Sequence, residues 1–257
     1  MSICSDGDNV MLIDFHANPR ELSPADFAEA VNAAGLDGVV IAASGTVDGL
    51  DGYVAALDTL GLKGFVGVEC TMERGAFVFI PRKDDASFRN ADWQGAHTLW
   101  TPAEIKEVVA DLDGTLIATH PYCRTDEPPM GDRVYMVKGV KGIVTRTGKG
   151  QVTWDRLAEQ AAAKKGAAQL GSSCGSPEDL GRAATSIYGE ISGQSDLVDA
   201  LLEQRCTAVE MDSETQTRDR SEPKPLERSD DRRDGRGRDG RRGRDDRRGG
   251  RERRPRR

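Results

Sequence analysis

The chain has 257 residues, and 37% of them are hydrophobic, which allows one large α/β domain or two small ones with a sizeable core. The formal net charge of −7 hides an uneven distribution: residues 218–257 hold 18 lysines and arginines against 10 acidic residues, whereas residues 1–217 hold 18 against 33. No apolar run approaches the ~18 residues that a membrane-spanning helix needs, so we expect no membrane partner.

The first residues, MSICSDGDNV, lack the basic and apolar segments of a secretory signal peptide. The five cysteines are an odd number and have no CxxC spacing, as is typical of reduced thiols in a reducing compartment. We therefore expect a cytoplasmic protein without a disulfide framework.

Short apolar runs alternate with helical segments from residue 10 onward. The segment SPADFAEAVNAAG predicts a helix, because Ser23 suits the N-cap, Pro24 the first helical position and Gly35 the position past the end. A short polar connection between two later apolar runs predicts a hairpin. The first predicted elements are strands at Val10–Phe15 and Gly38–Ala43, a helix at Asp51–Leu60, and the hairpin strands Gly64–Glu69 and Ala76–Pro81.

The second half continues this alternation. TPAEIKEVVADL opens with a capping box of Thr101 and Glu104, and SPEDLGRA predicts the start of another helix with Ser176 as its cap. Such alternation favours parallel βαβ units, and about seven strands favour a barrel or a strongly curved sheet with ligands on the loops after the strands. The remaining predicted elements are strands at Thr115–Thr119, Gly142–Thr145 and Ala167–Gly171 and a helix at Trp154–Lys165.

The loops just past the strand ends carry the motifs. In chain order they read DFHAN, AASGT, GVECT, ATHPYC, IVTRTG and GSSCGSPEDLGRA. In this order and spacing they resemble the PHP (polymerase and histidinol phosphatase) family of metal-dependent phosphoesterases over roughly residues 10 to 190. The segments LSPADFAEAVNAAGLDGVVIA, GVE and HPY are the best matches together with the last loop. Six short matches in the family's order make the resemblance fairly specific, although no single match would be.

The resemblance implies a distorted (β/α)7 barrel, related to the TIM barrel, with two or three metal ions at its C-terminal mouth. Histidines and carboxylates converge on these ions, and a bridging water becomes the hydroxide that attacks phosphorus. His16 matches the first histidine of the HxH pair, Glu69 the metal-bridging glutamate and His120 the histidine of the HP motif. Asp14 matches an acidic position that would orient His16, and Asn18 stands at the second histidine of HxH.

Most of the family's other ligand positions are substituted. Alanine, valine and glycine have no ligating side chain, and serine and asparagine are poor substitutes for imidazole at a transition metal. The resemblance therefore implies a catalytically degenerate PHP-like domain that acts by binding a protein partner, a phosphate-bearing ligand or nucleic acid. The substituted positions are Ala43, Ser44, Val144, Thr147, Ser173 and Gly175.

A working enzyme with a reduced site is the alternative. Two histidines and a glutamate are the ligands of some mononuclear zinc hydrolases, so His16, Glu69 and His120 would hold a single zinc or manganese ion in a metal-dependent phosphoesterase. In the family, however, the two histidines belong to different ions. We therefore expect either no metal or one divalent ion.

The end of the chain differs in composition from the rest. No apolar residue follows Leu226, so this segment cannot bury enough surface to order its backbone, and we expect disorder. It is either a solubilising extension or an arm for weak binding of nucleic acid or an acidic partner, since arginine with glycine suits phosphate contact. The arm could instead fold back electrostatically onto the acidic domain of its own chain. The expected domains are an extension at 1–9, a barrel at 10–212 and a tail at 213–257. The arginines expected to make contact are Arg241, Arg242, Arg247 and Arg248.

Overall fold

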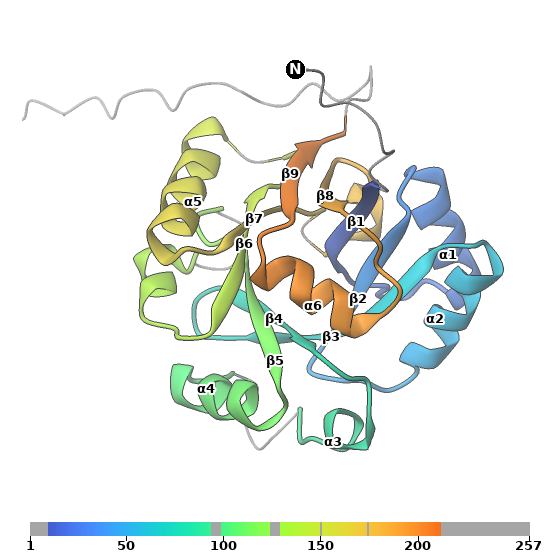
Figure 1. Cartoon of the computed structure of the whole chain (residues 1–257), viewed down its shortest axis with the longest axis horizontal. Helices are drawn as coiled ribbons and strands as arrows, with labels where there is room; N and C mark the ends of the chain where they lie inside the picture. The colour runs from blue at the N-terminus through green and yellow to red at the C-terminus, as the bar shows by residue number, and fades with distance from the viewer. Residues whose placement is uncertain (1–9, 94–98, 124–128, 150, 174, 212–257) are drawn as a thin grey trace, which may run out of the picture. The chain divides into compact units, whose positions relative to one another are not determined.

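A single sheet of nine strands organises the chain, in the order β7-β6-β5-β4-β3-β2-β1-β8-β9 (Figure 1). The structure is a computed structural model, and it describes residues 10–93, 99–123, 129–149, 151–173 and 175–211. The strands are β1 (Val10–Ala17), β2 (Gly38–Ser44), β3 (Lys63–Thr71), β4 (Ala76–Pro81), β5 (Gly114–Thr119), β6 (Val140–Arg146), β7 (Ala168–Gly171), β8 (Ala183–Tyr188) and β9 (Cys206–Glu210).

Most strands run in one direction, and two run against it. β1, β2 and β3 are mutually parallel, as are β5, β6 and β7, whereas β4 is antiparallel to both of its neighbours. β8 pairs antiparallel with β1 and with β9. The sheet is therefore a barrel of nine strands with two reversed members, where the sequence predicted a (β/α)7 arrangement.

The barrel nearly closes where β7, at one edge of the sheet, meets β8 and β9 at the other. The hydroxyl of Thr185 on β8 lies 3.0 Å from both the backbone nitrogen and the backbone oxygen of Gly171 on β7. A Cβ atom at Gly171 would lie 2.1 Å from the carbonyl oxygen of Ala184, so only glycine permits this approach. Thr185 thus supplies, with one side chain, the hydrogen bonds that a neighbouring strand would otherwise make.

Six α-helices and two short 3₁₀ turns connect the described strands. The start of α1 is as predicted, because the Ser23 hydroxyl accepts a hydrogen bond from the backbone nitrogen of Asp26 at 3.2 Å. The capping box also forms, since Thr101 and Glu104 exchange backbone-to-side-chain hydrogen bonds of 2.7 and 3.3 Å. The elements are α1 (Pro24–Ala33), α2 (Leu50–Thr59), α3 (Ala86–Arg89), α4 (Pro102–Asp111), η1 (Gly131–Tyr135), α5 (Val152–Lys165), η2 (Pro177–Asp179) and α6 (Gln194–Leu202). None of the described helices has the length and apolar character needed to traverse a lipid bilayer.

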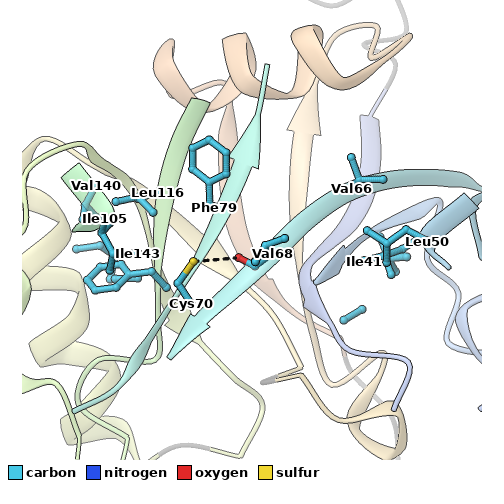
Figure 2. Close-up of a cluster of buried hydrophobic side chains, with 14 of the residues drawn as sticks. Ile41, Leu50, Val66, Val68, Cys70, Phe79, Ile105, Leu116, Val140 and Ile143 are labelled. Atoms are coloured by element: carbon cyan, nitrogen blue, oxygen red, sulfur yellow. Dashed lines mark hydrogen bonds between the residues drawn. The ribbon is translucent and has the colours of Figure 1, made fainter. Parts of the chain in front are cut away.

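The two faces of the sheet bury separate apolar clusters. Between the sheet and its outer helices lies a cluster that includes Val68, Phe79, Leu116 and Ile143 (Figure 2). Cys70 belongs to this outer cluster, and burial raises the pKa of its thiol to about 12. The thiol therefore faces away from the barrel interior and stays protonated near neutral pH, which suits a structural cysteine.

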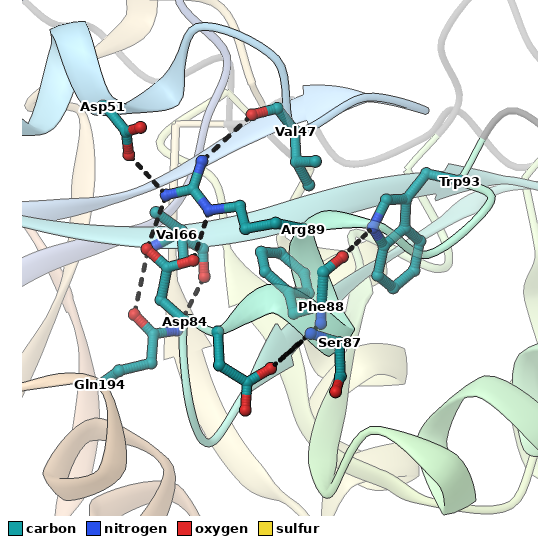
Figure 3. A network of polar contacts seen from close by, with 10 residues as sticks. Val47, Asp51, Val66, Asp84, Ser87, Phe88, Arg89, Trp93 and Gln194 are labelled. Carbon is teal, nitrogen blue, oxygen red and sulfur yellow. Dashed lines mark hydrogen bonds and ion pairs between the residues drawn. The ribbon is translucent and has the colours of Figure 1, made fainter.

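The barrel interior is filled by side chains from the strands and is closed at one end by α6. Leu197, Val198 and Leu201 of this helix pack on interior residues such as Phe65 and Ile117. The helix is tied to the sheet by Gln194, whose side-chain amide accepts from the backbone nitrogen of Val66 at 3.1 Å and donates to its oxygen at 2.7 Å (Figure 3). The end of the barrel where the strands begin is thus occupied by a helix.

A salt-bridge network fastens the α3 insertion to α2. The Arg89 guanidinium binds both carboxylate oxygens of Asp84 at 2.5 and 2.6 Å (Figure 3). It also binds Asp51 at 2.7 Å and the backbone oxygen of Val47 at 3.2 Å. A bidentate arginine of this kind holds a defined geometry, so the insertion is positioned rigidly on the barrel.

The sequence prediction after residue 175 was wrong in one element and incomplete in others. The helix predicted from Ser176 is only the single 3₁₀ turn η2, because Leu180 has an extended backbone (ψ 136) and Gly181 a positive φ of 80°. Strand β8, helix α6 and strand β9 follow, and the prediction did not include them. Together they close the barrel.

Candidate functional site

Three side chains singled out by the motifs come together at the carboxyl ends of the parallel strands. His16 lies near the end of β1 and Glu69 near the end of β3, whereas His120 follows the last residue of β5. Phe15 belongs to the interior cluster, and its neighbour His16 also reaches Glu69 inside the mouth. Adjacent side chains on one face require an irregular strand, and the register of β1 against β2 indeed shifts between Asp14 and Ala17.

Glu69 has both carboxylate oxygens engaged by the protein. Its Oε1 lies 3.2 Å from the Nε2 atom of His16, and its Oε2 accepts a hydrogen bond of 2.5 Å from the Ser44 hydroxyl. The Ser44 oxygen in turn accepts from the Asn18 side-chain amide at 3.3 Å. Asn18, Ser44, Glu69 and His16 therefore form a continuous polar chain across the mouth.

The contact between His16 and Glu69 is short, but its angles do not suit a hydrogen bond. Although the two atoms lie 3.2 Å apart, both ring nitrogens of His16 lack a well-formed hydrogen bond within the described chain. We regard the contact as an electrostatic one, because its distance is short while its angles do not suit a hydrogen bond. The side chain of His16 is 3% exposed and that of Glu69 17% exposed.

Charge interactions set the protonation of this pair. Burial favours the neutral carboxyl of Glu69, but the neighbouring His16 and the Ser44 hydroxyl outweigh it and lower the pKa of Glu69 to about 2. Burial likewise favours a neutral His16, but Glu69 and then Asp14 outweigh it and raise the pKa of the imidazole. Near pH 6.5 the two side chains thus form an ion pair.

His120 differs from His16 in charge and backbone conformation. Burial of its ring and the charge of His16 lower the pKa of His120 to about 4, so the imidazole is neutral at physiological pH. Its φ of +30° is unusual for a residue other than glycine, and strain of this kind is often found at functional sites.

A small cavity lies beside His120. Its volume is about 10 Å³, enough for one water molecule. The cavity is lined by His120, Tyr122, Cys123, Val144, Thr147, Trp154, Asp155 and Ala158.

Asp14 holds the backbone of the mouth. Its carboxylate accepts hydrogen bonds from the backbone nitrogen of His16 at 2.9 Å, the Ser172 hydroxyl at 2.5 Å and the backbone nitrogen of Ser173 at 3.0 Å. Asp14 was expected to orient His16, and it does contact that residue, through the backbone and not through the ring. It also ties β1 to the segment after β7.

The substituted positions leave little that can hold a metal. Ala43 is half-buried, Val144 packs in the barrel interior, and Thr147 and Ser173 are buried. Gly175, at a φ of +76°, lies beside the ring of His16, where an added Cβ would be 2.9 Å from Nε2 and 2.8 Å from Cε1. Any residue other than glycine at position 175 would therefore collide with the imidazole of His16.

The spacing of the two histidines also argues against a shared ion. Their ring centroids are 6.2 Å apart and the planes are tilted by 30°. Two imidazoles on one tetrahedral zinc ion, with Zn–N bonds of about 2.0 Å, would have centroids roughly 5 Å apart. Within the ranges that the structure describes, no group of three or more histidine, cysteine or acidic side chains is arranged to hold a metal ion. The residues present do not fit a centre of two or three metals.

Two features of the site were not evident from the sequence. Ser44 was counted only as a missing ligand, and Ser172 was not singled out, yet each donates a hydrogen bond of 2.5 Å to a carboxylate of the mouth. No sequence signal predicts these contacts, because each joins residues that are 25 or 158 positions apart. The four tail arginines, Arg241, Arg242, Arg247 and Arg248, lie outside the described residues.

Comparisons with known proteins give the fold alone. No protein-family model matches the chain, and no curated protein matches it either. Among solved structures, an amidohydrolase from Chromobacterium violaceum with bound sulfate and no metal superposes with a TM-score of 0.53 at 14% identity, over 76% of this chain and 97% of the other. The chain has the fold of that amidohydrolase. A protein provisionally named as a metal-dependent phosphoesterase from Bifidobacterium adolescentis has a TM-score of 0.47 at 14% identity, over 63% of this chain and 87% of the other.

Proposed function

We propose that this barrel is a catalytically degenerate, PHP-like domain that acts by binding and does not hydrolyse phosphoesters. The observation that carries the proposal is the state of Glu69. Its Oε2 accepts the hydrogen bond of Ser44 and its Oε1 forms an ion pair with His16 at 3.2 Å, so both oxygens that would bridge two ions already face protein groups. A carboxylate that bridges two metals with one oxygen on each would have to give up both contacts.

The substituted positions support the same proposal. Val144 and Gly175 offer no ligating side chain, and the ring of His16 leaves no room for one at position 175. The ligand of a binding domain would then enter on the other side of the mouth, where Ser44 is exposed and Asn18 is half-buried. A phosphate-bearing ligand, a nucleic acid or a protein partner are the classes that we propose for it.

The test combines metal analysis with an assay of hydrolysis. Full-length protein purified without chelator should contain far less than one equivalent of zinc or manganese per chain. It should not hydrolyse p-nitrophenyl phosphate above the rate of buffer, even with added manganese or zinc. Near two equivalents of metal, or turnover that disappears in the His120→Ala variant, would show that the chain is an enzyme.

A phosphoesterase with one metal ion is the second candidate, and one observation favours it. Both ring nitrogens of His16 are buried without a well-formed hydrogen bond in the described chain, and such orphaned nitrogens are available to an ion. A bound zinc or manganese would supply Lewis acidity and a more acidic bound water. His16 and Glu69 would hold it, and the ring of His120 would have to move closer. One tightly bound equivalent that is lost in the His16→Ala variant, together with turnover, would support this candidate.

A further inference from the structure

A basic region interrupts the otherwise acidic barrel domain. Residues 129–171 contain eight lysines and arginines against three acidic residues, whereas the remainder of residues 1–217 contains ten against thirty. The region covers η1, β6, α5 and β7, which are neighbours in the fold (Figure 1). Eight of the 18 lysines and arginines of residues 1–217 therefore lie in this one part of the domain, with few acidic residues between them.

Four lysines of this region gather where β6 begins and α5 ends. The Nζ atom of Lys165 donates to the backbone oxygen of Val137 at 2.9 Å, next to Lys138 in the chain. Lys164 lies over the ring of Tyr135 at 4.6 Å. Gly142 pairs with Ala168, which places the start of β6, and hence Lys141, beside the residues just after α5. We call Lys138, Lys141, Lys164 and Lys165 the lysine sector.

Only two of the four lysines in the sector have a local structural role. Lys164 and Lys165 occupy the last turn of α5, where positive charge is favourable at the negative end of the helix dipole. Lys138 and Lys141 have no such role, because both are exposed and neither forms an ion pair or hydrogen bond through its side chain within the described ranges. Their charges remain available to a partner.

We propose that the lysine sector is a docking surface for the phosphate backbone of nucleic acid. It lies at the end of the barrel where the strands begin, and Lys141 is separated from Arg146 at the mouth by five residues of strand, or about 16 Å. The surface is therefore distinct from the site at His16 and Glu69, and the proposal does not depend on whether that site binds metal.

Two observations favour nucleic acid over an acidic protein as the partner. Lysine ammonium groups on an exposed face act as point charges, which suits a regularly charged phosphate backbone. The same chain also carries an arginine- and glycine-rich segment with a net charge of +8, a composition that suits contact with phosphates without reading of bases. The acidic remainder of the domain would repel a polyanion from other faces and so direct it to the sector.

The experiment compares two triple variants of the full-length chain that change the net charge equally. The sector variant carries Lys138→Gln, Lys141→Gln and Lys164→Gln, and the matched control carries Lys63→Gln, Lys83→Gln and Lys106→Gln at exposed lysines elsewhere. Lys165 is left unchanged because its hydrogen bond to Val137 is structural. Binding of fluorescently labelled duplex DNA and of single-stranded RNA is measured by anisotropy at several salt concentrations.

We expect the sector variant to bind at least about tenfold more weakly than the wild type at low salt. The plot of log affinity against log salt has a negative slope, and this slope should become less steep by about one unit for each lysine that contacts a phosphate. The control should stay within about twofold of the wild type. The two probes show whether the surface prefers duplex or single strand.

Three outcomes would overturn the proposal. Equal weakening in both triple variants would mean that only net charge matters, and unchanged binding in the sector variant would mean that the sector makes no contact. Binding of poly-glutamate as tightly as nucleic acid, with the same dependence on the sector, would indicate an acidic protein partner. Because Lys164→Gln also removes a cation–π contact, the double variant Lys138→Gln and Lys141→Gln is tested alongside, with thermal unfolding as a check of folding.

Discussion

The Ser44 hydroxyl lies 2.5 Å from the Oε2 atom of Glu69 and donates a hydrogen bond to it. The donor comes from the end of β2 and the acceptor from the neighbouring β3, where the two residues are direct partners in the parallel register. A hydroxyl in this position stabilises the charged form of the carboxylate without bringing any charge of its own. Ser44 thus takes part in setting the electrostatics of the mouth.

Replacing Ser44 by alanine should raise the pKa of Glu69 from about 2 toward its ordinary 4.5, because a hydrogen bond to the charged form is lost. The change can be measured by NMR titration of the Glu69 side-chain carboxyl. Asn18→Ala is the matched control, since Asn18 contacts Ser44 and not Glu69. An equal or larger rise in the control would contradict this role of Ser44.

The stability of the fold should decrease on acidification between about pH 6.5 and pH 4. The pKa of His120 is lowered from 6.5 to about 4 in the folded state, so in this window the unfolded chain binds a proton that the folded chain does not. The free energy of unfolding then falls as pH falls, with a slope of at most about 1.4 kcal/mol per pH unit for one group. His120→Asn should flatten this slope, because asparagine does not titrate and tolerates a positive φ.

Urea unfolding at a series of pH values measures the effect for both proteins. Glu69 gives a loss of stability in a lower window, since its depressed pKa contributes stability above about pH 4.5 that is lost toward pH 2. His16 acts in the opposite direction, because its raised pKa contributes stability that is lost as the pH rises through the folded value. An unchanged slope between pH 6.5 and 4 in the His120 variant would refute the assignment to His120.

Gly175→Ala should destabilise the fold by about 2–4 kcal/mol. The residue has a φ of +76°, and a Cβ would lie 2.8–2.9 Å from ring atoms of His16, so backbone strain and overlap add together. Gly35→Ala separates the two effects, because Gly35 has a φ of +69° and an added methyl there would meet nothing within 4 Å. It should cost only about 1 kcal/mol. Similar losses in both variants, measured by chemical unfolding, would mean that Gly175 does not press on His16.

Asp14→Ala should destabilise the fold by about 3 kcal/mol or more. The carboxylate is fully buried, and its removal leaves three donors, the backbone nitrogens of His16 and Ser173 and the hydroxyl of Ser172, without their acceptor. Ser172→Ala should cost only about 1 kcal/mol, since the two backbone donors remain. Thermal or chemical unfolding of both variants gives the comparison, and equal losses would show that the hydroxyl dominates.

Removal of the chain after Thr217 should weaken nucleic-acid binding and make it less sensitive to salt. The segment removed has a net charge of +8, and arginine–phosphate contacts release counterions. The full chain and the truncated one are titrated with single-stranded RNA and duplex DNA at low and physiological salt. Equal binding by the two proteins, or none by either, would leave the segment as a solubilising extension.

Local signals in the sequence located most of the elements that precede residue 175. The Ser23 cap, the capping box at Thr101 and the β3–β4 hairpin were all predicted and are confirmed, because each depends on residues close together in the chain. The approach of β8 to β7 depends instead on Thr185 and Gly171, which lie on strands that are not paired in the sheet and which no local motif marks. Contacts of this kind leave no signal in the local sequence.

The same difference between local and long-range contacts applies to the functional site. The order of the motifs indicated that His16, Glu69 and His120 follow three different strands, and parallel strands bring such positions to one end of a sheet. The engagement of Glu69 by Ser44, and the packing of Gly175 on His16, depend on side-chain rotamers and on a loop conformation with positive φ. The sequence therefore indicated which residues meet but not which hydrogen bonds and packing contacts they make.

The direction of β9 determines how the protein can be attached to a surface. β9 runs the same way as β1, since both pair antiparallel with β8, and it ends with Glu210 at 3.5 Å from Arg146 on the rim of the mouth. Val10 begins β1 at the opposite end, and the eight residues of this strand span about 23 Å. A biotin or fluorophore joined directly to Val10 therefore starts at the end away from the mouth, whereas one joined just after Met211 starts beside it.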